Sequence, residues 1–254
     1  MKKLSIITCT YNSEKYLQEC IESIIAQKLD INEYEHIFVD AYSTDNTKKI
    51  INEYAKKYLN VKLIERKPKW VYNAMNEGIK ESHWKYILCL NSDDWLEPEV
   101  LNDYLQYIKK TKEKDLYYWD ITFREGNNFK KSECSKRINK LLFKIWWFHC
   151  LIWHPSVLIK KTTFYELWMF DESKKIASDY GFRLNILKNN KEYIYYPKLV
   201  ANFRVHDWWI SSNLKNKKIS NDECDYFIKT YLPRYKKIAR RLILLYRSFK
   251  KLFK

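Results

Sequence analysis

The stretch 86-YILCLNSDDW-95 runs from an apolar segment into two adjacent carboxylates. A short, unbroken apolar run is typical of a strand that is buried on both faces of a parallel sheet. Burying a charged carboxylate without a partner is costly, so Asp93 and Asp94 are expected where this strand ends at the surface. The stretch therefore predicts a buried strand over residues 86–90 with a polar site at its carboxyl end.

Alternating strand-like and helix-like segments precede this stretch. Apolar runs at residues 4–9, 36–39 and 61–64 predict three more strands. The segments between the strands place apolar side chains on one face of a helix, at Leu17, Ile21, Ile24, Ile25, Ile50, Ile51, Tyr54, Tyr58, Tyr72, Met75 and Ile79. Strands that alternate with helices form a largely parallel sheet with helices on both faces, so the sequence predicts an α/β fold.

The second half of the chain shows a looser pattern. Strands are expected at residues 116–123, 155–160 and 199–205, and a helix is expected at residues 177–187. Residues 124–153 show no readable periodicity. This half is therefore less well defined by the sequence than the first hundred residues.

The C-terminal segment, residues 234–254, contains nine lysines and arginines and no acidic residue. Its apolar side chains form one helical stripe, at Ile238, Leu242, Leu245, Tyr246, Phe249 and Phe253. A stripe of this kind with basic residues around it predicts an amphipathic helix that binds an anionic membrane surface. The alternative is that the stripe packs on the rest of the protein and leaves the lysines in solvent.

Composition excludes several classes of protein. The 254-residue chain has a net charge of +16, and 46% of its residues are hydrophobic, which excludes a disordered chain. The sequence lacks an uncharged run of about 18 apolar residues, so no membrane span is predicted. The N-terminal apolar run is too short for a signal peptide, and we therefore expect a cytoplasmic protein. The basic excess is concentrated at the C-terminus, which argues against a nucleic-acid partner. Six cysteines without a C-x-x-C pair predict reduced thiols.

Polar residues follow three of the predicted strands: Thr10–Asn12, Asp40, and the pair Asp93 and Asp94. In an open parallel sheet, ligands bind beyond the carboxyl ends of the strands, so these segments are expected to form one site. Adjacent carboxylates are suited to Mg²⁺ or Mn²⁺, and such an ion can hold a diphosphate. A solvated turn is the simpler alternative for this pair.

The order of these segments resembles that of the family 2 glycosyltransferases. The resemblance covers residues 1–212 and rests on the segments 5-SIITCTYNS-13, 39-VDAYSTD-45, 72-YNAMNEGI-79, 90-LNSDD-94, 154-HPS-156, 170-FDES-173, 178-SDY-180, 201-ANFR-204 and 210-IS-211. It implies an inverting enzyme with an A-type, Rossmann-like nucleotide-binding domain. Residues 1–100 would form the nucleotide-binding half and residues 101–212 the acceptor half. Residues 213–254 would form a helical basic extension.

The resemblance also implies the residues of the donor site. The nucleotide would be contacted by Thr10, Tyr11, Asn12, Asp40 and Asp93. Asp40 would accept a hydrogen bond from the base, for which the N–H of uracil is suitable, and Asp93 would lie near the ribose or the sugar. Asp94 would bind the Mn²⁺ or Mg²⁺ that neutralises the leaving diphosphate.

On the acceptor side, inversion needs a base that takes the proton of the attacking hydroxyl group. Asp179 matches the base position of the family, and Asp171 is its nearest rival. A carboxylate at the start of a helix also has a structural role, because it interacts favourably with the helix dipole. Arg66, with its neighbour Lys67, and His154 are possible phosphate or acceptor contacts.

The predicted function is transfer of a sugar from a nucleoside diphosphate-sugar, with UDP as the expected nucleotide, to a saccharide or lipid-linked acceptor in cell-surface polysaccharide synthesis. The enzyme would be peripheral to the inner face of the cell membrane. One alternative is a nucleotidyltransferase of similar fold, although residues 8–14 lack the glycines and lysines of a phosphate-binding loop. The other is a catalytically inactive module that binds membranes or polyanions.

Tryptophan stands at positions where similar proteins usually have glycine. The chain has ten tryptophans and three glycines, and the positions concerned are Trp70, Trp84, Trp119, Trp168, Trp208 and Trp209. Glycine is favoured in turns because it reaches positive φ without strain, which tryptophan does not. Either the site is rich in aromatic side chains, which stack on sugars, or UGA codons that specify glycine have been read as tryptophan.

Overall fold

The computed structural model describes residues 4–67, 70–131, 154–206 and 214–231. Its elements are, in chain order, β1 (Leu4–Thr10), α1 (Glu14–Ile25), β2 (Tyr34–Asp40), α2 (Thr47–Lys57), β3 (Val61–Glu65), α3 (Val71–Glu81), β4 (Tyr86–Cys89), β5 (Trp95–Leu96), α4 (Val100–Lys110), β6 (Leu116–Glu125), β7 (Asn128–Lys131), η2 (His154–Ser156), β8 (Val157–Lys160), α6 (Lys161–Glu166), α7 (Ser178–Lys188), β9 (Tyr193–Arg204) and α8 (Leu214–Tyr231).

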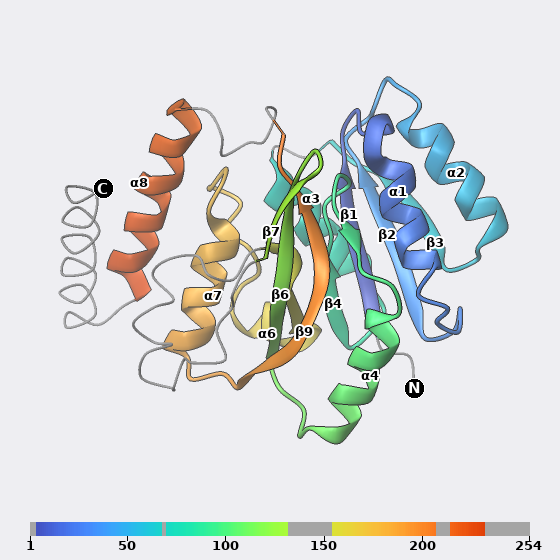
Figure 1. Ribbon diagram of the computed structural model, residues 1–254. Helices are drawn as coiled ribbons and strands as arrows, with labels where there is room; N and C mark the ends of the chain where they lie inside the picture. The colour runs from blue at the N-terminus through green and yellow to red at the C-terminus, as the bar shows by residue number, and fades with distance from the viewer. Residues whose placement is uncertain (1–3, 68–69, 132–153, 207–213, 232–254) are drawn as a thin grey trace.

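One sheet joins both halves of the chain (Figure 1). Its strand order is β3-β2-β1-β4-β8-β6-β9-β5, and β7 pairs with β6 beside this path. Strands β3, β2, β1 and β4 are mutually parallel. Strand β8 is antiparallel to β4 and β6, whereas β6 and β9 run parallel to each other. The predicted α/β class with a Rossmann-like, parallel N-terminal half is confirmed.

Helices cover both faces of the sheet because successive strand residues point to opposite sides. Leu4 and Ile6 of β1 pack in a core with residues of α1 and α4. Ile7, the residue after Ile6, points to the other face and packs in the other core with residues of α3, α6 and α7. Helix α2 lies beside α1 against β2, on the side of the molecule away from α7 and α8 (Figure 1).

Several elements of the second half differ from the sequence prediction, among them β7 and α6, which no local pattern predicted. Helix α4 forms where no helix was predicted, and its buried side chains, Val100, Leu101, Tyr104 and Leu105, follow helical spacing. Strand β9 begins at Tyr193 rather than at residue 199, because its first residues pair with Leu116–Tyr118 of β6. Tertiary pairing therefore extends a strand that the local apolar pattern predicts only in part.

The tryptophans do not all occupy turns. Trp119 lies within β6, is fully buried, and donates its indole N–H to the carbonyl oxygen of Pro155 at 3.2 Å, so the expectation of a turn is wrong there. Trp168 is 88% exposed and has a φ of +69°, the only positive φ among the described tryptophans. Trp208 and Trp209 lie outside the described residues.

Helix α8 packs directly on α7 (Figure 1). The crossing is close at Gly181, where an added Cβ atom would lie 2.4 Å from a ring carbon of Phe227. Helix α8 is thus part of the same packed unit as α7, whereas the amphipathic helix predicted over residues 234–254 lies outside the described residues. None of the described helices is long and apolar enough to cross a membrane.

The cysteines in the described part of the chain are free thiols, as predicted. They are Cys9, Cys20, Cys89 and Cys224. Burial raises the pKa of Cys9 to about 12, so this thiol stays protonated at neutral pH. Cys134 and Cys150 lie outside the described residues.

Candidate active site

Asp40, the last residue of β2, ties together the loops that follow β1 and β2. Its buried carboxylate accepts hydrogen bonds from the Thr10 hydroxyl at 2.8 Å, the Ser43 backbone N–H at 2.7 Å and the Ser43 hydroxyl at 2.6 Å. A carboxylate offers about four acceptor positions, so one position remains for a further donor. Thr10 and Asp40 are therefore together, as the sequence predicted for the ends of these strands.

Asn12 joins the same two loops. Its backbone N–H donates to the Ser43 hydroxyl and its side-chain oxygen accepts from the Thr44 backbone N–H, both at 2.9 Å. Asn12 and Tyr42 both have positive φ, +48° and +58°, a conformation that strains a tyrosine more than an asparagine. The rings of Tyr11 and Tyr42 are 66% and 52% exposed, so two aromatic side chains border the joined loops.

Asp94 and Asp93 have different surroundings. Asp94 is buried, and its carboxylate accepts from the Asn91 side-chain amide at 2.8 Å and from the Arg204 backbone N–H at 3.0 Å. Burial, and then the charge of Asp93, raise the pKa of Asp94 well above its usual range. The Asp93 side chain is 30% exposed, and its Oδ2 lies 2.8 Å from Nε2 of His206. Asp94 thus belongs to the protein interior, whereas Asp93 lies at the surface.

Arg204, at the end of β9, holds the turn that carries these carboxylates. Its Nε donates to the carbonyl oxygen of Asp93 at 3.0 Å, and its guanidinium also pairs with Glu19. The guanidinium lies 4.2 Å from the ring centre of Tyr16 and 4.5 Å from that of Trp95. Arg204 lies in one of the segments that carry the family resemblance, where no role was predicted for it. His206 was not predicted, and the one pattern that marks it is its position just after a predicted strand.

Asp179 lies in the first turn of α7. The Tyr72 hydroxyl is 2.9 Å from its Oδ1, and Arg183 is ion-paired with its Oδ2 at 2.8 Å. Burial, and then the charge of Asp179, raise the pKa of Tyr72 well above its usual value, so this phenol stays neutral. Asp179 lines a small cavity of about 10 Å³ together with Cys89, the last residue of β4. The structure thus places Asp179 near the strand end that precedes Asp93.

Glu223 of α8 anchors the segment that leads into α7. Its carboxylate accepts hydrogen bonds from the backbone N–H groups of Lys175 at 2.8 Å and of Ile176 and Ala177 at 2.9 Å. The Tyr72 hydroxyl also lies 2.6 Å from the carbonyl oxygen of Ile176, which links this segment to the neighbour of Asp179. Sequence reasoning missed Glu223, since it lies beyond the family resemblance and no local pattern marks it.

Three other predicted residues are less central. Arg66 is ion-paired with Glu81 at 3.2 Å, and its side chain is 44% exposed, so a phosphate would compete with that carboxylate. Asp171 accepts from the backbone N–H and the hydroxyl of Ser173, which is a turn arrangement. Of His154 only the backbone is described, as the first residue of η2.

Solved structures of known proteins define the class of fold. The chain is similar to Staphylococcus aureus TarS in complex with UDP-GlcNAc, with a TM-score of 0.76, 21% identity, and coverage of 93% of this chain and 70% of that one. It is also similar to the mannosyltransferase PcManGT of Pyrobaculum calidifontis in complex with GDP-Man and Mn²⁺, with a TM-score of 0.60, 14% identity, and coverage of 82% and 58%. The architecture is that of the A-type glycosyltransferases.

The family follows from the sequence match. Residues 5–166 match the family described as Glycosyl transferase family 2, and the chain belongs to this family. It is also similar to the Poly(ribitol-phosphate) beta-glucosyltransferase of Bacillus spizizenii, with 30% identity over 236 residues. That match covers 89% of this chain and 32% of the relative, so the chain spans about a third of the relative's length.

Proposed function

We propose that this protein transfers a sugar from a UDP-sugar to a hydroxyl group of a saccharide or lipid-linked acceptor, with inversion at the anomeric carbon, in cell-surface polysaccharide synthesis. The observation that carries the proposal is the position of three carboxylates, Asp40, Asp93 and Asp179, around the carboxyl ends of β2 and β4 in a family 2 fold. The UDP-GlcNAc bound by TarS supports this donor, and the poly(ribitol-phosphate) named for the Bacillus relative supports a polymer with free hydroxyl groups as the acceptor.

For the donor site, we assign the base of the nucleotide to the joined loops after β1 and β2. Asp40 has one acceptor position left for an N–H of uracil, and Thr10 and Ser43 fix the orientation of its carboxylate. Asp40 is covered in this structure, so the direct contact requires the loop residues around it to move. The exposed rings of Tyr11 and Tyr42 are available to stack on the base, which favours a nucleotide at this place.

For the metal, we propose Asp93 and His206 as ligands in place of Asp94. Asp94 is only 1% exposed and bonded within the protein through both oxygens, whereas Asp93 Oδ2 and His206 Nε2 lie 2.8 Å apart on side chains that are partly exposed. One carboxylate and one imidazole favour Mn²⁺ over Mg²⁺. Within the described ranges no cluster of three metal-binding side chains occurs, so phosphate oxygens and water would complete the shell. When bound, the ion neutralises the leaving diphosphate.

For the chemical step, we propose Asp179 as the general base. The acceptor oxygen attacks the anomeric carbon, the bond from that carbon to the diphosphate oxygen breaks, and the hydroxyl proton passes to the Asp179 carboxylate. Arg183 is ion-paired with one carboxylate oxygen at 2.8 Å, and the Tyr72 hydroxyl, whose single proton is shared between Asp179 and the Ile176 carbonyl, lies 2.9 Å from the other. These contacts fix the direction from which the base meets the acceptor, which is how positioning lowers the barrier.

The sequence of residues 234–254 adds a proposal about location. This segment lies outside the described residues, and its nine basic side chains and apolar stripe favour attachment to an anionic membrane surface. Attachment at the cytoplasmic face would hold the enzyme beside a lipid-linked acceptor.

The test is a panel of UDP-sugars with Mn²⁺, in which UDP release is measured with and without acceptor polymer. We expect turnover of at least one donor, and the Asp179→Asn variant should keep UDP affinity while turnover falls by about 10²- to 10⁴-fold. Absence of donor turnover across the panel would contradict the proposed function. For the metal, calorimetry should show that Asp93→Asn loses the Mn²⁺ dependence of UDP binding, and equal dependence in wild type and Asp93→Asn would contradict the assignment.

A further inference from the structure

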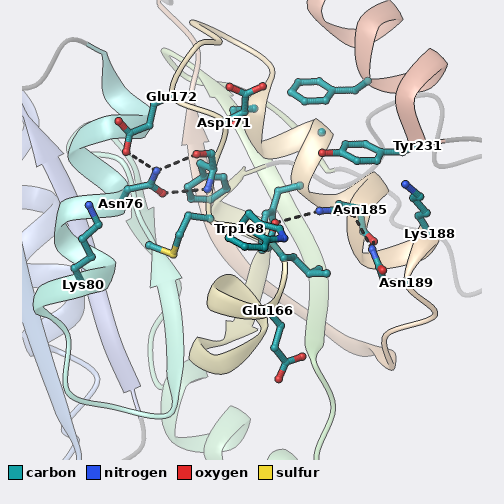
Figure 2. A pocket seen from close by; sticks show the side chains of 17 residues that line it. Asn76, Lys80, Glu166, Trp168, Asp171, Glu172, Asn185, Lys188, Asn189 and Tyr231 are labelled. Atoms are coloured by element: carbon teal, nitrogen blue, oxygen red, sulfur yellow. Dashed lines mark hydrogen bonds between the residues drawn. The ribbon is translucent and has the colours of Figure 1, made fainter.

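A cavity of about 730 Å³ lies outside the candidate active site, between α3, residues 166–172, α7 and α8 (Figure 2). This volume is within the range of small-molecule binding sites. Helix α7 lines it with one stripe of side chains, which are Ser178, Gly181, Phe182, Asn185, Lys188 and Asn189. Asp179 and Arg183 are not among them, so the cavity and the candidate base use two faces of the same helix.

The lining combines aromatic rings with polar groups. Trp168, 88% exposed, lies in the middle of the cavity wall in Figure 2, with Tyr231 of α8 on one side and Asn76 of α3 on the other. An exposed indole of this kind offers a flat apolar face, and the amide and carboxylate groups around it offer hydrogen bonds. A ligand with apolar C–H faces and many hydroxyl groups matches both features.

A buried hydroxyl at the cavity supports a polar ligand. Ser178 is 1% exposed, and its Oγ has no hydrogen-bond partner among the described residues. Leaving such a group unpaired costs free energy, typically about 1–3 kcal/mol. A hydroxyl group of a ligand can both donate and accept, and it reaches the covered Ser178 Oγ once the side chains over that atom move aside.

The charge of the lining argues against an anionic ligand. Two cations, Lys80 and Lys188, face three carboxylates, those of Glu166, Asp171 and Glu172. Lys80 is moreover ion-paired with Glu77 at 2.8 Å. Sites for phosphate-rich polymers collect an excess of lysine and arginine, which this cavity does not have.

From these features we propose that the cavity binds an uncharged pyranose unit of the acceptor chain, at a distance from the hydroxyl group that reacts. Trp168 packs against the sugar ring, and the polar groups of α7 bond its hydroxyls. Ser178 and Asp179 are consecutive in the first turn of α7 but lie on two of its faces, so a chain held in the cavity has to pass the N-terminal end of this helix to reach the candidate base. The assignment to the acceptor rests on the proposed function, whereas the binding of a neutral saccharide does not.

The experiment is saturation-transfer NMR on the full chain with maltotetraose, cellotetraose and chitotetraose, and with inorganic polyphosphate as the anionic probe. We expect at least one tetrasaccharide to bind and Trp168→Ala to weaken that binding at least fivefold. Trp70→Ala is the matched control, because Trp70 is 45% exposed and does not line the cavity. UDP-sugar hydrolysis without acceptor should be unchanged in both variants.

Three results would overturn the proposal. They are a lack of binding by all three tetrasaccharides, binding that Trp168→Ala and Trp70→Ala leave equally strong, and binding of polyphosphate in place of the neutral sugars. UDP-sugar hydrolysis by the wild-type protein shows whether failure of the cavity proposal and failure of the proposed function occur together or separately. A protein that hydrolyses the donor but binds no tetrasaccharide refutes the cavity alone, and one that binds tetrasaccharides without donor turnover refutes the acceptor assignment.

Discussion

Replacing Glu223 with alanine tests whether α8 holds the segment that carries the candidate base. The variant removes the acceptor of three backbone N–H groups, at 2.8, 2.9 and 2.9 Å, next to the N-terminus of α7. An intramolecular hydrogen bond contributes about 0.5–1.5 kcal/mol, so the three bonds together contribute about 1.5–4.5 kcal/mol. Glu223 is only partly buried, so water replaces some of these bonds, and we expect a total loss of about 2 kcal/mol.

Thermal unfolding and steady-state kinetics measure the two consequences. A loss of about 2 kcal/mol corresponds to a Tm lower by roughly 4–8 °C for a protein of this size. Turnover should fall by about tenfold with little change in the KM for the donor. The reason is that Tyr72 connects Ile176 to Asp179, so a shift of this segment displaces the candidate base from the acceptor hydroxyl. Asp222→Ala, an exposed neighbour on the same helix, is the control. Equal Tm and equal turnover in the two variants would refute the anchoring role.

Three further predictions follow from single residues or segments. Trp168→Gly should raise stability by about 1 kcal/mol, since glycine adopts the φ of +69° without strain and the exposed indole buries little surface. UGG at codon 168 would contradict the miscoding hypothesis, whereas UGA there would remove the indole and with it the proposed saccharide contact in the cavity. Burial lowers the pKa of His36 from 6.5 to about 3, so on acidification the unfolded chain binds a proton at a higher pH than the folded chain does. The free energy of unfolding should therefore be unaffected by His36 above pH 6.5 and should decrease as the pH falls toward 3. The urea midpoints at pH 7.5 and pH 5 should differ less in His36→Gln than in the wild type, and an equal difference would contradict this cause. A chain that ends at Pro233 should lose salt-sensitive co-sedimentation with phosphatidylglycerol vesicles, and undiminished binding would exclude residues 234–254 as the anchor.

The sequence by itself determined the parallel half of the fold and the edge of the sheet at which the candidate site residues gather. Strands buried on both faces need continuous apolar residues, so the runs before Thr10, Asp40 and Asn91 were readable locally, and the polar residues after them had to lie at the carboxyl edge. Helix periodicity located α1, α2 and α3 for the same reason, because each buries one stripe against the sheet.

Only the tertiary structure decided which carboxylate of the pair Asp93 and Asp94 is exposed and what holds the segment that leads into α7. Asp93 and Asp94 are equivalent in the sequence, and they differ because the backbone of Arg204, 110 residues away, bonds Asp94 from β9 and turns it inward. Glu223 of α8 contacts the start of α7 although it lies 46 residues after Ala177 in the sequence. Contacts between segments so distant leave no periodic or local signal, because the geometry that creates them exists only once the sheet and its helices are packed.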